Sequence, residues 1–318
     1  MDKKVIVTGG GGFIGSNLVR ALCNQDYHVT VLDNFSTGSL KNLEGVACEV
    51  IQGDICDNQI VKEITRDADF IFHLAARGSV PRSITEPVEA FNINVLGTQN
   101  ILESIRNKKT KLIFTSSSSV YGANVLDKKI EKTWTSPLSP YAASKLSCEA
   151  LIQSYRVAFG INAVIFRLFN VYGPFQRPDM KYSAVIPKWI WESQRNGRIS
   201  VYGDGSSSRD FTYVDDVVNV LVASLARDFD LDHPINLAFG QGVALSEIVD
   251  FLGRRFQNLH IEYLDARKSD VKESLNNPEF IKELFPSIIP VKIRDGLEKT
   301  VTWINETFAK DSQYEKNQ

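Results

Sequence analysis

The first strand-like run of the chain leads directly into a glycine-rich turn. Residues 5–7 are apolar, and the turn after them places Gly9, Gly12 and Gly15 in a G-x-x-G-x-x-G spacing before a helix-like pattern over residues 14–23. Without a Cβ, glycine lets the backbone approach a pyrophosphate, and the N-terminus of the next helix offers free N–H groups and a positive dipole. The turn therefore predicts a dinucleotide site at the start of an α/β fold.

An acidic residue supports this prediction. The next strand-like run, residues 28–32, is followed by Asp33, which lies close to the spacing of about 20 residues that is typical of such sites. A carboxylate there accepts hydrogen bonds from the hydroxyls of an adenosine ribose and repels a 2′-phosphate. We therefore expect NAD, and not NADP, as the cofactor.

Strand-like and helix-like segments alternate through the first half of the chain. Short β-rich runs at residues 70–74, 112–114 and 163–166 join the two above, and helical patterns cover residues 90–105 and 142–159. This alternation predicts a Rossmann-type α/β fold with a doubly wound parallel sheet.

The prolines and glycines after Asn170 indicate a second domain, a smaller C-terminal α/β domain for substrate. We expect residues 1–168, with a return of the chain at about 210–240, to form the NAD-binding domain. Residues 169–209 and 241–310 would form the substrate domain, and 311–318 a polar tail.

Composition excludes several classes of function. The 36 Lys and Arg residues nearly balance the 38 Asp and Glu residues, whereas nucleic-acid binding needs a clustered excess of positive charge. No apolar run reaches the roughly 18 residues of a membrane span, and the 4 cysteines lack metal-ligand or disulfide spacing. We expect a soluble cytoplasmic protein without a nucleic-acid partner, a membrane partner or a metal.

Tyr141 and Lys145 are four residues apart in a helical pattern and therefore share one helix face. A phenol has a pKa of about 10, and an ammonium one turn away is expected to lower it toward neutral pH. The preceding strand-like run leads into Thr115-Ser116-Ser117-Ser118-Ser119, which places hydroxyl groups at the sheet edge where ligands bind in open α/β folds. Together these residues predict a general base in a ligand cleft.

Further motifs complete an ordered set along nearly the whole chain. They are Leu32-Asp33-Asn34, Gly53-Asp54-Ile55, His73-Leu74-Ala75-Ala76, Asn94-Val95-Leu96-Gly97-Thr98, Arg167-Leu168-Phe169-Asn170-Val171-Tyr172-Gly173-Pro174, Gly203-Asp204-Gly205, Ser208-Arg209-Asp210-Phe211 and Arg267-Lys268-Ser269-Asp270. With the glycine turn and the Ser, Tyr and Lys residues, this set resembles the extended short-chain dehydrogenase/reductase family, in particular its nucleotide-sugar epimerase branch.

The resemblance implies NAD as cofactor and a UDP-sugar as substrate. The residues it implies for catalysis are Ser117, Tyr141 and Lys145. Those implied for NAD binding are Gly9, Gly12, Phe13, Ile14, Asp33, Asn34, Ser36, Gly38, Asp54, Ile55, Leu74, Ala75, Ala76, Asn94, Tyr141 and Lys145. Those implied for the UDP-sugar are Ser79, Ser117, Ser119, Tyr141, Asn170, Val185, Ser200, Tyr202, Arg209, Arg267, Asp270 and Ser274. We interpret His73, at the end of a buried strand, as a structural residue that packs or forms local hydrogen bonds.

The reaction implied is a transient oxidation at the sugar C4. Tyr141 would remove the C4 hydroxyl proton while hydride leaves for NAD, and hydride would return to the other face of the resulting 4-keto sugar. Related 4,6-dehydratases carry an Asp-Glu pair, and decarboxylases favour a glutamate, where this chain has Ser118 and Ser119. The missing carboxylates favour a UDP-hexose 4-epimerase.

The sugar is predicted from one position. Epimerases restricted to UDP-glucose and UDP-galactose often carry a bulky tyrosine where this chain has Ser274, so an N-acetyl group would fit, and residues 78–83 also resemble those of enzymes for N-acetylated sugars. We expect interconversion of UDP-N-acetylglucosamine and UDP-N-acetylgalactosamine for polysaccharide biosynthesis. UDP-glucose, a UDP-uronic acid and a non-catalytic NAD-binding sensor or scaffold stay open as alternatives. The resemblance also implies a homodimer built on helices 90–105 and 142–159.

Overall fold

The computed structural model describes residues 3–124, 126, 128–266 and 273–308. Its main sheet has seven strands in the order β12-β7-β5-β4-β1-β2-β3, and every pairing in it is parallel. The strands are Lys4–Thr8 (β1), His28–Asp33 (β2), Glu49–Gln52 (β3), Phe70–His73 (β4), Lys111–Ser117 (β5), Ala163–Leu168 (β7) and Ile235–Leu237 (β12). The predicted Rossmann-type parallel sheet is confirmed. Sequence analysis did not identify β3 and β12, which are short.

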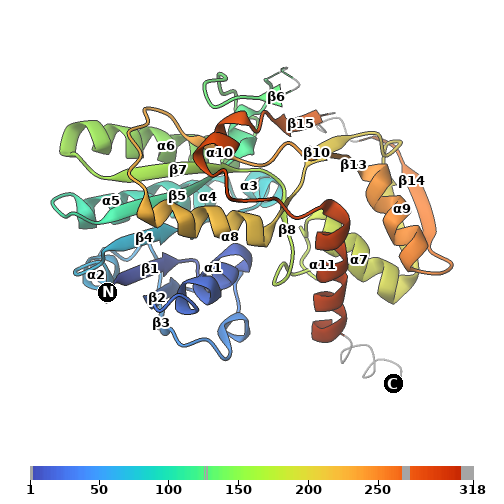
Figure 1. Ribbon diagram of the computed structural model, residues 1–318, viewed down its shortest axis with the longest axis horizontal. Helices are drawn as coiled ribbons and strands as arrows, with labels where there is room; N and C mark the ends of the chain where they lie inside the picture. Colours follow the sequence, from blue (N-terminus) through green and yellow to red (C-terminus); the bar gives the residue numbers. More distant parts are fainter. Residues whose placement is uncertain (1–2, 125, 127, 267–272, 309–318) are drawn as a thin grey trace.

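Helices cover both faces of this sheet (Figure 1). Phe13–Cys23 (α1) and Val214–Ala223 (α8) pack together on one face. Asn58–Ile64 (α2), Gly97–Ile105 (α5) and Pro140–Phe159 (α6) pack on the other. The alternation of strand side chains assigns each to a face. In β1, Val5 and Val7 belong to the core beside α1 and α8, whereas Ile6 belongs to the core beside α5 and α6.

The helix predicted over residues 90–105 begins earlier and is not uniform. Val80–Thr85 (α3) and Pro87–Phe91 (α4) precede it, a π-helical turn follows over Asn92–Leu96 (η2), and α5 completes it. A π turn inserts an extra residue into the helix, which changes the direction of the side chains after it, and such turns are frequent at functional sites. Sequence periodicity over 16 residues cannot reveal this local change.

The described C-terminal part consists of short strands and four helices, and one of its sheets also includes β6, which comes from the first half of the chain. Lys128–Lys129 (β6), Ser208–Asp210 (β10), Gly242–Ala244 (β13) and Glu273–Asn276 (β15) form a sheet in the order β13-β10-β15-β6. Val171–Tyr172 (β8) pairs with Thr212–Tyr213 (β11), and Arg198–Tyr202 (β9) pairs with His260–Leu264 (β14). The helices are Val185–Asn196 (α7), Leu245–Arg255 (α9), Glu279–Leu284 (α10) and Ile293–Phe308 (α11). Single-turn helices occur at Leu40–Leu43 (η1), Ser118–Tyr121 (η3) and Ser224–Ala226 (η4).

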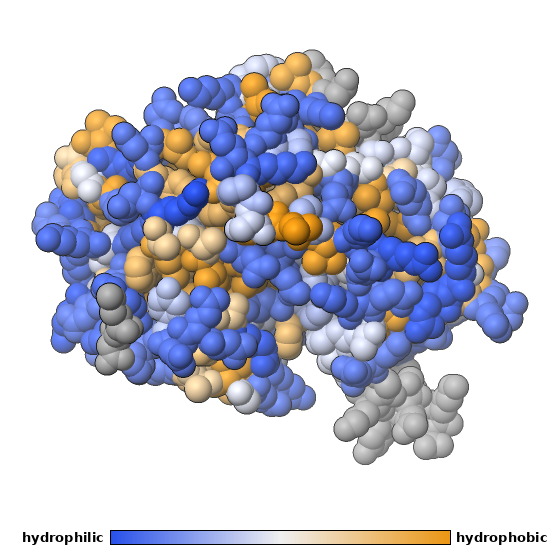
Figure 2. Space-filling model, in the orientation of Figure 1, coloured by the Kyte–Doolittle hydropathy of each residue, from blue (hydrophilic) through white to orange (hydrophobic). Residues whose placement is uncertain are grey.

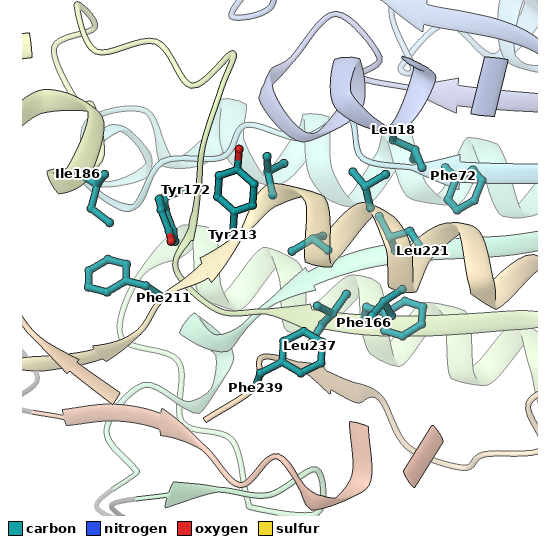
Figure 3. Close-up of a cluster of buried hydrophobic side chains, with 14 of the residues drawn as sticks. Leu18, Phe72, Phe166, Tyr172, Ile186, Phe211, Tyr213, Leu221, Leu237 and Phe239 are labelled. Atoms are coloured by element: carbon teal, nitrogen blue, oxygen red, sulfur yellow. The ribbon is translucent and has the colours of Figure 1, made fainter. Parts of the chain in front are cut away.

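One hydrophobic cluster joins the main sheet to the C-terminal part (Figure 3). Leu18, Phe72, Phe166 and Leu221 lie at its main-sheet end, and Tyr172, Ile186, Phe211, Tyr213 and Phe239 continue it toward the C-terminal strands. After β11 the chain returns to the main sheet as α8 and β12. The division of the chain into two domains at the residue ranges given above stays a prediction.

On the face of the molecule in Figure 2, apolar side chains gather near the position of α8, and hydrophilic residues cover most of the remainder. Within the residues that the structure describes, no helix has the length and apolar character that a membrane crossing requires.

Candidate active site

The glycine turn is folded so tightly that two of its glycines cannot carry a side chain. Gly9 has φ +74°, and a Cβ there would lie 2.7 Å from the backbone nitrogen of Ala75; a Cβ on Gly15 would lie 2.1 Å from the carbonyl oxygen of Gly9. Gly12 begins α1 and faces a cavity, where a Cβ would meet only the Gly9 oxygen, at 3.2 Å. The turn thus leaves bare backbone at a helix N-terminus, which fits the diphosphate of a dinucleotide.

A narrow pocket beside this turn contains most of the residues predicted to bind the adenosine half of NAD. It is lined by Gly9, Gly12, Asp33, Asn34, Ser36, Asp54, Ile55, Leu74, Ala75 and Ala76. Thr37, Gly53, Arg77 and Ile93 also line it and were not predicted. Gly38 was predicted as well but does not line this pocket; a Cβ there would come within 2.7 Å of the Gly11 carbonyl carbon.

The two acidic residues of this pocket are held by hydrogen bonds. Asp33 accepts one from the N–H of Gly11, 2.9 Å, and one from the N–H of Phe35, 2.8 Å, while burial raises its pKa. Asn34 Nδ2 donates to Asp54 Oδ2 at 2.8 Å. Burial opposes ionisation of Asp54, but hydrogen bonds from the Cys56 N–H and from Asn34 lower its pKa overall. Each carboxylate oxygen keeps a lone pair for a ribose hydroxyl or an adenine.

A larger cleft, of about 640 Å³, lies at the carboxyl ends of β4 and β5. Its lining includes residues predicted to bind NAD and residues predicted to bind the UDP-sugar. They are Gly9, Gly12, Phe13, Ile14, Leu74, Ala76, Ser79, Ser117, Ser119, Tyr141, Lys145 and Asn170. Gln176 and Tyr182 also line it. They lie in the proline-rich stretch after Asn170, where no periodic pattern marks them as site residues.

Two elements bring the three catalytic candidates together in this cleft. Ser117 ends β5; its Oγ lies 3.0 Å from Ser119 Oγ and accepts from the Ser119 N–H at 3.2 Å. Tyr141 lies in the first turn of α6, after the N-cap Ser139, and Lys145 lies one turn later. A hydrogen bond links the side chains of Ser117 and Tyr141. The predicted Ser, Tyr and Lys residues therefore share one cleft.

The pKa of Tyr141 differs from the sequence prediction. We expected the ammonium of Lys145 to lower it, but burial raises the pKa of Tyr141 above its ordinary value, and the hydrogen bond with Ser117 only partly opposes the rise. The Lys145 ammonium instead donates to the carbonyl oxygen of Thr115 at 2.8 Å and lies 4.7 Å from the centre of the Phe114 ring. The prediction was wrong because it counted the charge of Lys145 and not the burial of the phenol.

Burial also acts on Lys145 and His73. It lowers the pKa of Lys145 to about 8, although Cys148 and Glu149 oppose this. His73 is bound between Thr8 Oγ1, 2.7 Å from Nδ1, and Thr98 Oγ1, 3.0 Å from Nε2, and burial lowers its pKa to about 3. His73 is therefore buried and hydrogen-bonded through both ring nitrogens, which confirms its interpretation as a structural residue.

Asn94 is buried and lines neither the adenosine pocket nor the 640 Å³ cleft. It is 2% exposed; its Nδ2 donates to Ser144 Oγ at 2.8 Å, and its Oδ1 accepts from the Arg77 N–H at 2.7 Å. Its predicted contact with the nicotinamide stays a prediction, and in this structure its amide connects α6 to the segment after β4.

Asn170, predicted for the UDP phosphates, lines the 640 Å³ cleft, whereas the other described residues predicted for the UDP-sugar beyond Asn170 lie outside it. Arg209 on β10 pairs in register with Ser274 on β15. Ser200 and Tyr202 are on β9, where Ser200 Oγ donates to Glu262 Oε2 at 3.2 Å. Val185 begins α7 directly after Ala184, which lines the cleft. Arg267 and Asp270 lie outside the described residues.

Comparison with known proteins identifies the family of this chain. The model of the NAD dependent epimerase/dehydratase family matches residues 5–238. The UDP-glucuronate 4-epimerase of Thermodesulfobacterium geofontis is 33% identical over 320 residues, which cover 95% of this chain and 96% of that protein. The putative UDP-glucose 4-epimerase of Methanocaldococcus jannaschii is 33% identical, with 94% and 98% covered.

A solved structure extends the similarity to three dimensions. The UDP-N-acetylglucosamine 4-epimerase from Methanobrevibacter ruminantium, in complex with UDP-N-acetylmuramic acid, matches with a TM-score of 0.90 at 35% identity and covers 96% of this chain and 99% of its own. The sequence match, the shared fold and the glycine turn beside a Tyr and Lys pair lead to one assignment. This chain belongs to the NAD dependent epimerase/dehydratase family.

Proposed function

We propose that this protein is a UDP-sugar 4-epimerase that interconverts UDP-N-acetylglucosamine and UDP-N-acetylgalactosamine with retained NAD. The observation that carries the proposal is the cleft in which Ser117, Tyr141 and Lys145 face the glycine turn. When bound, NAD accepts and returns the hydride at the sugar C4 and brings the positive charge of its nicotinamide ring into the cleft. The ring charge would offset the burial that raises the pKa of Tyr141.

The side chains of this protein handle the proton and the orientation of the sugar. Tyr141, as general base, takes the proton from the C4 hydroxyl and later returns it. Ser117 hydrogen-bonds the same phenol and so orients the hydroxyl group between them. Lys145 is mostly protonated at neutral pH, since its pKa is about 8, and its ammonium, which the Thr115 carbonyl oxygen holds at the cleft, would bind the nicotinamide ribose.

The cleft lining favours epimerisation over elimination. Removal of water from the 4-keto sugar needs an acid and a base near C5 and C6, which carboxylates would supply. Among the described residues that line the cleft there is no Asp or Glu, and Ser118 and Ser119 lie where the dehydratase pair is expected. With no such pair, the keto sugar turns over in the pocket and is reduced on its other face.

The choice of an N-acetylated sugar is supported by Ser274 and by one relative. Ser274 pairs in register with Arg209 on the neighbouring strand, and it is a small residue at the position where the restricted epimerases often carry a tyrosine. The Methanobrevibacter structure, at 35% identity, is that of a UDP-N-acetylglucosamine 4-epimerase. Because the Thermodesulfobacterium and Methanocaldococcus relatives are named as epimerases of UDP-glucuronate and UDP-glucose, these two sugars stay open as alternative substrates of this protein.

A competition experiment tests the substrate. Purified protein receives no added cofactor and equal amounts of UDP-N-acetylglucosamine, UDP-glucose and UDP-glucuronate, and the anomeric protons are followed by NMR. We expect the UDP-N-acetylgalactosamine signal to appear first. If UDP-galactose or UDP-galacturonate appears first, the reaction stands and the N-acetyl assignment is wrong. No epimer of any sugar would favour a non-catalytic NAD-binding protein.

We also propose a homodimer in the cytoplasm. Large apolar side chains are exposed along α3, α4, η2 and α6, namely Ile84, Val88, Phe91, Leu96, Val157 and Phe159. Val157 is 89% exposed, and exposed apolar side chains on neighbouring helices are typical of an interface when they form a patch. All four cysteines are free thiols, as in a reducing compartment. Sedimentation should give a dimer, and Val157→Glu a monomer; an unchanged mass would contradict this interface.

A further inference from the structure

Tyr141 is held at its backbone as well as at its phenol. Its N–H is one of the first donors of α6 and has no partner within the helix. The N-cap Ser139 serves the next residue, since its Oγ accepts from the Ala142 N–H at 3.1 Å. The Tyr141 N–H instead donates to Ser83 Oγ, 3.0 Å away on α3.

Ser83 is fully buried and has both of its hydrogen-bonding roles occupied. Its hydroxyl donates to the Val80 carbonyl oxygen at 2.8 Å within α3 and accepts from Tyr141. The residues just before it, 78–81, line the same cleft as the phenol of Tyr141. Ser83 itself does not line the cleft, so it cannot touch the substrate.

A second connection reaches the carbonyl side of Tyr141. Ser144 Oγ donates to the Tyr141 carbonyl oxygen at 2.8 Å and accepts from Asn94 Nδ2 at 2.8 Å. Asn94 Oδ1 in turn accepts from the Arg77 N–H at 2.7 Å. Residues 77–83, which we call the cleft wall, are therefore tied at both ends to the backbone of Tyr141. Asn94 reaches this position from the π-helical turn.

We propose that Ser83 is a positioning residue for the reaction, which fixes Tyr141 against the cleft wall so that its phenol meets Ser117 and the C4 hydroxyl of the sugar. A displacement of a catalytic group by about 1 Å can reduce turnover about 100-fold. The inference rests on the proposed epimerase activity and extends it to a residue outside the cleft.

The test compares two buried serines with the same local role. Ser104 on α5 is 8% exposed and donates to the Ile101 carbonyl oxygen at 2.7 Å, as Ser83 does to Val80, but it lies outside the site. Ser83→Ala and Ser104→Ala thus lose the same bond within a helix, and only Ser83→Ala releases Tyr141. The assay uses whichever UDP-sugar the unsubstituted protein epimerises, so an error in the sugar assignment does not affect it.

We expect Ser83→Ala to lower kcat about 10- to 100-fold with NAD content and KM nearly unchanged, and Ser104→Ala to keep the original kcat. The acid limb of the pH–kcat profile should also move to higher pH in Ser83→Ala, because the hydrogen bond from Ser117 that lowers the pKa of Tyr141 is weakened. A purely structural serine would not move this limb.

If Ser83→Ala does not fold, Ser144→Ala releases Tyr141 from the other side and should move the acid limb of the pH–kcat profile in the same direction. If Ser83→Ala has the same kcat and the same acid limb of the pH–kcat profile as Ser104→Ala, the proposal is overturned.

Discussion

The carboxyl edge of the main sheet and the short strands of the C-terminal part place their functional candidates in different ways. At the sheet edge, β1, β4, β5 and α6 bring the glycine turn, Ser117, Tyr141 and Lys145 around one cleft. In the C-terminal part, Arg209, Ser274 and Ser200 lie on strands of three to five residues in two separate sheets. Parallel strands of regular length fix where their ends meet, whereas short strands are positioned only by the tertiary packing around them.

If the sheet-edge cleft carries out the chemistry and the C-terminal strands do not, Tyr141→Phe should have the largest effect on turnover. Loss of the phenol removes the general base, so turnover should fall by at least about 1,000-fold while bound NAD and the fold remain. Absorbance of the released cofactor and an NMR assay of epimerisation measure the two properties separately. If the variant also loses NAD, Tyr141 supports the cofactor site and the assignment as base is unsupported.

A second prediction concerns the retention of NAD at the sheet edge. Asp33→Ala should weaken NAD binding about 10- to 100-fold, the loss expected for hydrogen bonds to a charged group. The matched control is Asp57→Ala, because Asp57 also accepts two backbone N–H bonds, from Gln59 and Ile60, but caps α2 outside the pocket. Dialysis followed by cofactor measurement gives the result. Equal retention in both variants would place Asp33 outside the NAD site.

A third prediction concerns the choice of sugar by the C-terminal strands. Ser274→Tyr should reduce kcat/KM for UDP-N-acetylglucosamine about 10-fold relative to UDP-glucose, since one pocket contact discriminates to about this extent. Ser206→Tyr is the control, because Ser206 is exposed in the loop before β10. Equal losses on both substrates would show that Ser274 does not select the sugar, and this region would then have no assigned specificity residue.

The smallest expected effect is a pH dependence from Lys145. Burial lowers its pKa to about 8, so the ammonium is present below pH 8 and is lost as the pH rises above it. We expect the kcat/KM of the protein to fall along a basic limb near pH 8, and Lys145→Arg to move that limb upward because a guanidinium stays protonated. A limb unchanged by Lys145→Arg would assign it to another group.

The sequence was most informative where a motif lies on a regular element. The glycine turn and the Tyr141 and Lys145 pair follow from local residue spacing, Asp33 from its separation from the glycines along the chain, and Ser117 from the family resemblance. All of these residues line two pockets that share several residues. Gln176, Tyr182 and Ser83 could not be found in this way, because their roles depend on which distant residue they meet. The raised pKa of Tyr141 was missed for a similar reason, since burial depends on tertiary packing.

The central claim is that hydride leaves and returns to C4 of the same sugar within one protein molecule. The most direct test gives purified protein, without added NAD, UDP-N-acetylglucosamine that carries deuterium at C4. We predict UDP-N-acetylgalactosamine with the deuterium still at C4, because the label is transferred to the retained cofactor and back without exchange with water. Deuterium lost to solvent, or a reaction that requires added NAD, would contradict the account.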